Sequence, residues 1–295
     1  MLQEGIDEYI ASLSMNEQGY GGSNPNTIVA YRNDLNQACA YLQRLHIENW
    51  QQVTREDIAH YLLEMREAQA YRPATIARKL ASLKTFFRYL RSIGVLAVDP
   101  IENLGVPRVQ KDLPQVLTQE QIACLFRQVA VDTPVGIRDL AMLQMLYATG
   151  MRVSELVSLN LDDVDVEAAT LVCQGRAGKN KRVLPLSALA LEATKRYLSA
   201  ARQRLVLRHP GEQAFFVNHH GERLTRQGFW LIIKGYARQA GITTITPHML
   251  RHSFAILMLQ NGMELRSVQE LLGHAHLATT QVYSQLAREG VKTTV

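Results

Sequence analysis

The chain has 295 residues, of which 47% are hydrophobic and 20% are charged, as in a folded globular protein long enough for two domains. Its apolar runs stay well short of the about 18 residues that a membrane-spanning helix needs, and its acidic N-terminus lacks the basic region of a signal peptide. Its three cysteines are scattered without a CxxC pair. These features argue against a membrane protein and a disulfide framework, and they predict a soluble cytoplasmic protein.

The net charge of +5 is unevenly distributed along the chain. Residues 1–110 carry 11 basic and 12 acidic side chains, a net charge of −1, whereas residues 111–295 carry 21 basic and 15 acidic ones, a net charge of +6. A basic C-terminal half predicts a polyanionic partner, of which nucleic acid is the usual one. A protein with a basic surface and no such partner would show the same balance.

The first hundred residues are predicted to form a small helical domain. Apolar residues recur at helical spacing over residues 28–42. Thr54, followed three residues later by Asp57, is typical of the start of a second helix. Pro73 begins a third helix, since proline is tolerated in a first turn, and Gly94 ends it.

The third helix carries basic side chains opposite its apolar stripe. Such charges usually do no more than solvate a surface, and contact with DNA phosphates is the alternative. The candidates for that contact are Arg78, Lys84 and Arg88.

Residues 106–116 are predicted to link this first domain, residues 1–105, to a second domain, residues 117–295. The linker is polar and rich in proline, and it lacks helical periodicity. The second domain is predicted to be mostly helical. One helix begins after Thr118, and the others cover residues 137–148, 188–207, 228–240, 251–261, 265–272 and 279–287. Two short strands, residues 170–173 and 182–186, are joined by a turn at residues 175–181 and form one small sheet.

Four segments of the second domain carry residues suited to chemistry. In the first, Arg152 follows the helix-ending Gly150, so that its guanidinium can face a ligand or, alternatively, pair with Glu155. The second segment is the basic turn from Gly178 to Arg182, which by itself would be an ordinary solvated loop.

The third segment places His248 and Arg251 three residues apart, so that both project from one face of a helix. His248 and His252 have the spacing of a metal-binding pair, but the acid of an HExxH motif is absent and no metal site is predicted. The fourth segment contains Leu-Gly-His ending at His274, and Tyr283 follows nine residues later. A tyrosine in an amphipathic helix is by itself more often part of a core.

In combination and in chain order, the four segments are similar to the tyrosine recombinase (phage integrase) family. Residues 149–159 and 271–283 follow the pattern of its Xer-type members almost residue by residue. The resemblance covers the whole chain and implies a mainly α-helical fold with a small antiparallel β-sheet. It also implies a two-domain C-shaped clamp, with a helical, SAM-like core-DNA-binding domain before the catalytic tyrosine-recombinase domain.

The resemblance implies site-specific DNA recombination, in which strands are cut and rejoined through a covalent 3′-phosphotyrosine at Tyr283, without metal, nucleotide or other cofactor. Arg152 and Arg251 would clamp the scissile phosphate, because each guanidinium presents a planar, permanently charged fork to two phosphate oxygens. His248 and His274 can donate to the same phosphate or accept the tyrosine proton.

The resemblance also implies that a lysine of the basic turn protonates the departing 5′-hydroxyl. The turn departs from the family pattern Gly-Lys-Gly-x-Lys-x-Arg, so that Arg176 could stand at the lysine position, but an arginine is a poor proton donor. Lys179 is therefore the predicted acid, with Lys181 as the alternative.

The implied partner is double-stranded DNA, bound by a homo- or hetero-tetramer assembled on two DNA sites, with no membrane involved. Arg223, Arg226 and Lys234 are candidate DNA contacts in the second domain. A DNA relaxase similar to type IB topoisomerases and an inactive DNA-binding relative are the alternative functions. Chromosome-dimer resolution, plasmid resolution, phage integration and transposon movement are all open as biological roles.

Overall fold

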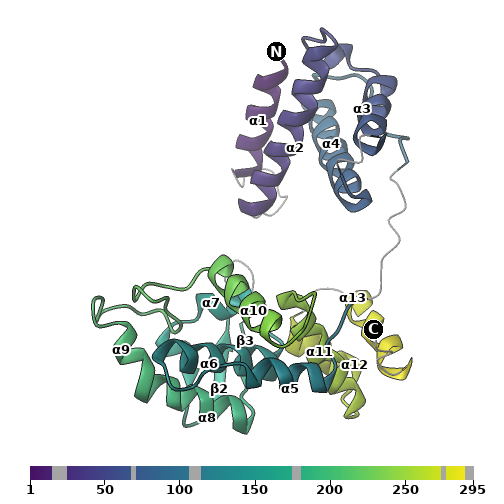
Figure 1. Ribbon diagram of the computed structural model, residues 1–295. Coiled ribbons are helices and arrows are strands. Elements are labelled where there is room, and N and C mark those ends of the chain that lie inside the picture. The colour runs from purple at the N-terminus through teal and green to yellow at the C-terminus, as the bar shows by residue number, and fades with distance from the viewer. Residues whose placement is uncertain (15–24, 68–70, 106–113, 175–180, 274–276, 290–295) are drawn as a thin grey trace. The chain divides into compact units, whose positions relative to one another are not determined.

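The computed structural model divides the chain into two compact units, residues 1–111 and 112–295 (Figure 1). It describes residues 1–14, 25–67, 71–105, 114–174, 181–273 and 277–289, so most of the predicted linker lies outside the described residues. Within these ranges no helix is both long and apolar enough to cross a membrane.

In its described residues, the first unit is a bundle of four α-helices, with one short 3₁₀ helix between the second and the third. The helices are α1 (Leu2–Ser14), α2 (Pro25–Arg44), α3 (Arg55–Glu67) and α4 (Pro73–Ser92), and the 3₁₀ helix is η1 (Trp50–Gln52). The three predicted helices are confirmed. Thr54 and Asp57 bond reciprocally at the start of α3, where the Thr54 N–H donates to an Asp57 carboxylate oxygen at 2.8 Å and the Asp57 N–H donates to the Thr54 hydroxyl at 3.2 Å.

The sequence did not predict α1, although its buried residues Leu2, Ile6 and Ile10 recur every four positions. The side chain of Trp50 fixes this helix from a distance in sequence, because its indole Nε1–H donates to the Leu2 carbonyl at 2.8 Å. The helix thus depends on a tertiary contact rather than on a local start signal.

A buried ion pair joins α2 to α4. Lys79 and Asp34 are each 2% exposed, and 3.3 Å separates the Lys79 ammonium from an Asp34 carboxylate oxygen. Lys79 also donates to Gln37, and Arg78 pairs with the same Asp34 carboxylate. Because burying a charge without a partner is costly, this cluster sets how the two helices pack.

We expect Asp34→Leu to lower the free energy of unfolding of the first unit by about 3–5 kcal/mol, since Lys79 would stay buried without a counter-charge. The double variant Asp34→Leu/Lys79→Met should recover most of that loss. Urea unfolding of the full chain measures both, with buried Trp50 fluorescence as the reporter in a Trp230→Phe background. Equal destabilisation of the single and double variants would show that the charge pairing contributes little.

The second unit is mostly helical around one small sheet. Its helices are α5 (Gln119–Arg127), α6 (Pro134–Thr149), α7 (Val153–Ser158), α8 (Ala188–Arg196), α9 (Gln203–Leu205), α10 (Arg226–Gln239), α11 (Pro247–Gln260), α12 (Leu265–Leu272) and α13 (Leu277–Glu289). A 3₁₀ helix, η2 (Leu161–Asp163), precedes the sheet, and a π-helical segment, η4 (Tyr197–Arg202), joins α8 to α9. The predicted helices are confirmed, although α11 begins earlier than predicted and so includes His248.

The sheet is antiparallel with the order β1-β2-β3, formed by β1 (Val164–Asp165), β2 (Thr170–Cys173) and β3 (Arg182–Pro185). The two longer strands were predicted, and β1 adds an edge of two residues. Cys173 pairs with Arg182, so the first residue of β3 lies where the chain returns from the basic turn.

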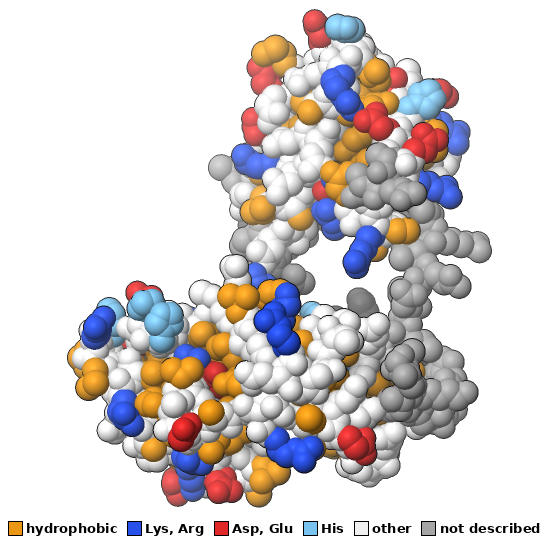
Figure 2. All heavy atoms as spheres, viewed as in Figure 1, with side chains coloured by type: hydrophobic (Ala, Val, Ile, Leu, Met, Phe, Trp, Pro, Cys, Tyr) orange, Lys and Arg blue, Asp and Glu red, His pale blue; other side chains and the backbone are white. Residues whose placement is uncertain are grey.

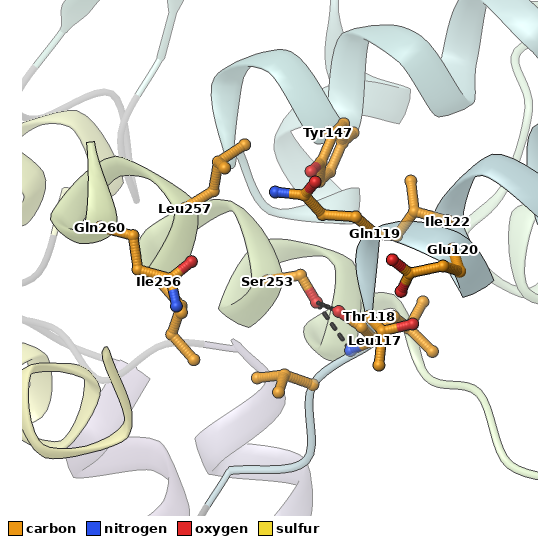
Figure 3. Close-up of a pocket in the computed structure, with 11 residues that line it drawn as sticks. Leu117, Thr118, Gln119, Glu120, Ile122, Tyr147, Ser253, Ile256, Leu257 and Gln260 are labelled. Carbon is orange, nitrogen blue, oxygen red and sulfur yellow. Dashed lines mark hydrogen bonds between the residues drawn. The ribbon is translucent and has the colours of Figure 1, made fainter. Parts of the chain in front are cut away.

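The apolar helix α6 runs through the core of this unit and packs against α8, η4 and α11. The chain entering the unit is attached to α11 by Ser253, whose hydroxyl accepts the Leu117 N–H at 2.8 Å and lies 3.2 Å from the Leu117 carbonyl (Figure 3). A cavity of about 250 Å³ lies beside this contact, between α11 and the start of α5. The contact ties the start of the unit to the helix that carries His248 and Arg251.

Candidate active site

The C-terminal end of α12 accepts hydrogen bonds from three arginines. The Leu271 carbonyl accepts from Arg182 at 2.8 Å, the Leu272 carbonyl accepts from Arg251 at 2.6 Å, and the Gly273 carbonyl accepts from Arg152 at 3.1 Å. The last carbonyls of a helix have no partner within it and form the negative end of its dipole, so they suit guanidinium groups. Three arginines that are distant in sequence therefore meet at one helix end.

Glu155 supplies the balancing carboxylate. Its side chain is 8% exposed and accepts from the Arg152 guanidinium at 3.0 Å and from the Arg182 guanidinium at 2.9 and 3.1 Å. The backbone N–H of Arg152 also donates to it at 2.7 Å. Burial by itself would raise the pKa of Glu155, but the hydrogen bonds and charges of Arg182 and Arg152 outweigh burial and lower that pKa.

The two arginines of the predicted clamp differ in exposure. The Arg152 side chain is 39% exposed, whereas Arg251 is 3% exposed and donates to the Gly150 carbonyl at 2.6 Å as well as to Leu272. Burial and the charge of Arg152 lower the pKa of Arg251 to about 10, which still leaves it charged at neutral pH. Arg152 is thus the accessible member of the pair.

Two glycines allow these close approaches. Gly150 ends α6 and Gly273 ends α12, both in the left-handed conformation, with φ of 60° and 64°. A Cβ at Gly150 would lie 2.2 Å from a Phe254 ring carbon, and one at Gly273 would lie 3.0 Å from an Arg182 nitrogen. Each glycine therefore ends its helix and leaves room for a close neighbour, which is Phe254 at Gly150 and Arg182 at Gly273.

Tyr283 is buried, and its hydroxyl oxygen lies 2.7 Å from Nδ1 of His252. Burial raises the pKa of the Tyr283 phenol, and the charges of Arg251 and Arg152 oppose that rise only in part. Burial, His248 and Arg251 lower the pKa of His252 to about 4, so this imidazole is neutral at neutral pH. The resting site therefore holds a protonated phenol beside a neutral histidine.

His248 lies one turn before His252 on α11, with its ring 6.2 Å from the His252 ring. Partial desolvation, Arg251 and Arg152 lower the pKa of His248. Among the described residues no group of three or more His, Cys, Asp or Glu side chains gathers as metal ligands.

Two of the predicted site residues, Lys179 and His274, lie outside the described residues. Lys181, the alternative lysine, is exposed at the start of the described part of the hairpin. From the sequence, Glu155 is predicted only as an ion-pair partner and His252 only as half of a metal-binding pair, and Arg182 has no predicted role. Glu155 stands three residues after the N-cap Arg152, which is the spacing of a capping box, and this spacing could have indicated that Glu155 bonds to Arg152.

The predicted DNA contacts fall into two groups. Arg226 and Lys234 lie on the exposed face of α10, opposite the buried Phe229 and Ile233, and Lys234 lies over the Trp230 ring at 4.7 Å. Basic and hydrophobic side chains are visible side by side over α10 (Figure 2). This face is available to a polyanion.

Other candidates are engaged within the protein. The Arg223 guanidinium donates to the carbonyls of Val157 and Leu159 and to the Asn160 side chain. Arg78 pairs with Asp34, and Lys84 lies 3.4 Å from the Glu102 carbonyl, whereas Arg88 is exposed on α4. Arg223 thus stabilises residues 157–160, at the end of α7 and just after it.

A cluster of fixed positive charge next to a buried phenol is the arrangement that a phosphoryl-transfer enzyme with a tyrosine nucleophile would need. Comparison with known proteins gives the same class. Residues 115–289 match the phage integrase family, and residues 6–94 match the phage integrase N-terminal SAM-like domain.

The chain is 46% identical to the tyrosine recombinase XerC of Roseiflexus castenholzii, over 91% of this chain and 85% of that protein. It is 38% identical to the tyrosine recombinase XerD of Oceanobacillus iheyensis, over 99% of this chain and 97% of that protein. The chain therefore belongs to the phage integrase family, as the sequence pattern predicted.

Solved structures share the fold. A XerH site-specific recombinase bound to a palindromic difH substrate, in a post-cleavage complex, aligns with a TM-score of 0.72 at 21% identity and covers 98% of this chain and 92% of that one. A lambda integrase tetramer bound to a Holliday junction aligns with a TM-score of 0.74 at 16% identity and covers 96% of this chain and 76% of that one. The mainly α-helical fold with a small antiparallel sheet is confirmed.

We expect Glu155→Gln to destabilise the second unit by about 3 kcal/mol at neutral pH, near the lower end for breaking a buried ion pair, because an amide still accepts one hydrogen bond. A carboxylate whose pKa is lowered by folding stabilises the protein above its unfolded pKa, and that contribution is lost as the pH falls through the folded value. The difference between wild type and variant should therefore shrink as the pH is lowered below about 4.5.

Calorimetry of the full chain across this pH range measures the difference. Glu167→Gln is the matched control, because the Glu167 side chain is 89% exposed and its contact with Lys195 spans 3.9 Å. A Glu155→Gln deficit that stays constant with pH would contradict the assigned role of the carboxylate charge.

Proposed function

We propose that this chain is a site-specific DNA recombinase that cleaves and rejoins strands through a 3′-phosphotyrosine on Tyr283. The observation that carries the proposal is the buried Tyr283 phenol. Its oxygen is hydrogen-bonded to His252, the residue after Arg251, and the positive charges of Arg251 and Arg152 act on it. A phosphodiester drawn to those charges would meet a nucleophile already within the site.

The two arginines would stabilise the charge that builds on the phosphate during attack. Each guanidinium has five N–H groups, and the described hydrogen bonds of Arg152 and Arg251 to side chains and carbonyls use two of them in each case. The loss of one such donor in a preorganised site typically costs about 10²–10³ in rate. His248 and His274 would donate to the same phosphate.

Departure of the 5′-hydroxyl requires a proton, which we assign to Lys179, with Lys181 as the alternative donor. The energy of the broken bond would stay in the phosphotyrosine and would be used when a 5′-hydroxyl of another strand attacks. The reaction as proposed needs no water, metal or nucleotide.

DNA binding would use both units. The exposed stripe of α10 that carries Arg226 and Lys234, together with Arg88 on α4, would supply charge for phosphate contacts. Arg223 is left out of the proposed contacts, because its guanidinium already has three acceptors in the protein. We further propose a tetramer on two DNA sites in the cytoplasm, with residues 106–116 linking the DNA-binding and catalytic domains.

Tyr283→Phe is expected to bind DNA as the wild type does and to form no covalent adduct, since only the attacking oxygen is lost. Wild type and variant would be incubated with nicked fragments of the source genome in the presence of EDTA, and the DNA still linked to protein after denaturation would be sequenced. An adduct that persists in the variant would remove Tyr283 from the nucleophile role.

Lys179→Ala should slow cleavage by about 10²–10⁴, the usual contribution of a general acid, and Lys181→Ala should slow it far less. A substrate with a bridging 5′-sulfur should rescue the slow variant, because a thiolate leaves without a proton. The opposite ranking, with rescue of Lys181→Ala, would assign the proton to Lys181.

A further inference from the structure

His252 contacts the proposed nucleophile Tyr283, and no step of the proposed chemistry uses the His252 side chain. His252 is partly buried on α11, Tyr283 is buried on α13, and these two helices pack together (Figure 1). The distance of 2.7 Å between Nδ1 and the phenol oxygen is a short hydrogen bond between two groups that are both withdrawn from water.

Proton positions in this pair follow from the charges around it. The groups that act on it are His248 and Arg251 from α11 itself and Arg152 from the start of α7. Burial, together with His248 and Arg251, keeps the imidazole neutral, so that one of its ring nitrogens can accept a hydrogen bond. If Nδ1 accepts this hydrogen bond, the phenol proton already points at a base.

A bound phosphate would change this balance. Its negative charge beside Arg251 and Arg152 offsets the cations that disfavour a charged His252, so the imidazole becomes more basic when the substrate is in place. The same substrate makes the phenol more acidic as the oxygen begins to bond to phosphorus. The proton would therefore move only when DNA is bound.

We propose that His252 is a catalytic residue whose Nδ1 accepts the Tyr283 proton as the phenol oxygen attacks the scissile phosphorus. The O–H bond of Tyr283 breaks as an N–H bond forms on His252, and the new P–O bond to Tyr283 replaces the P–O bond to the 5′-oxygen. The leaving oxygen takes its proton from the lysine of the basic turn. This inference rests on the proposed function and leaves phosphate binding to His248.

The test compares His252→Asn with His252→Leu in the full chain. The Asn amide oxygen can stand close to the position of Nδ1 and accept the phenol hydrogen bond, but it cannot take the proton, whereas Leu can do neither. The probe is a nicked duplex that carries a site recovered with wild type by covalent capture, with a bridging 5′-sulfur so that leaving-group protonation does not limit the rate. Single-turnover adduct formation is followed against pH, and gel-shift affinity and thermal unfolding are measured for each variant.

Both variants should form adduct about 10²–10⁴ more slowly than wild type while binding the probe equally well. The wild-type rate should rise with pH through the ionisation of the bound histidine, and the Asn variant should lack that rise. If His252→Asn reacts at the wild-type rate and only His252→Leu is slow, His252 merely orients the phenol and the proton-transfer role is overturned. Wild-type rates in both variants overturn the whole inference.

These outcomes are distinct from failure of the proposed function. If wild type forms no adduct with any DNA, the recombinase proposal fails before His252 is tested. If the Leu variant unfolds, the Asn variant and its pH profile still decide the question.

Discussion

The site depends on one electrostatic constraint: three arginines must lie side by side in a partly buried place. Arg152, Arg182 and Arg251 would repel one another there without a source of negative charge. The buried carboxylate of Glu155 and the last carbonyls of α12 provide it, so that the cluster is held together yet keeps a net positive charge. A site of this kind is held together within the protein and has positive charge left over for the proposed contact with a phosphate.

The same environment keeps Tyr283, the proposed nucleophile, in its protonated form. Burial keeps the Tyr283 phenol protonated and the His252 imidazole neutral, with the two joined by a hydrogen bond. Such a resting pair protects a protein that acts on DNA from unwanted reaction, because a buried protonated phenol is a weak nucleophile. Membership of the phage integrase family agrees with this arrangement.

The first unit also places a buried carboxylate between two basic side chains, and there the pairing holds two helices together. The Asp34 carboxylate lies between Arg78 and Lys79, and it joins α2 to α4, the helix whose exposed side also carries Arg88. A basic side chain can therefore be either a possible contact for DNA or part of the internal framework. Arg223, with three acceptors inside the protein, belongs to the second kind.

The roles predicted for Arg152, His248, Arg251 and Tyr283 came from the resemblance of their order and spacing to the tyrosine recombinase family. Local signals in the sequence were sufficient for most helices and for the two longer strands, because caps and periodicity are properties of neighbouring residues. They did not predict α1, which depends on Trp50 from 48 residues away. Nor could they show that Glu155 is buried, that Arg182 joins it to α12, or that His252 bonds to Tyr283. Those contacts join segments distant in the chain, and only the packing of α7, α11, α12, α13 and the sheet brings their partners within reach.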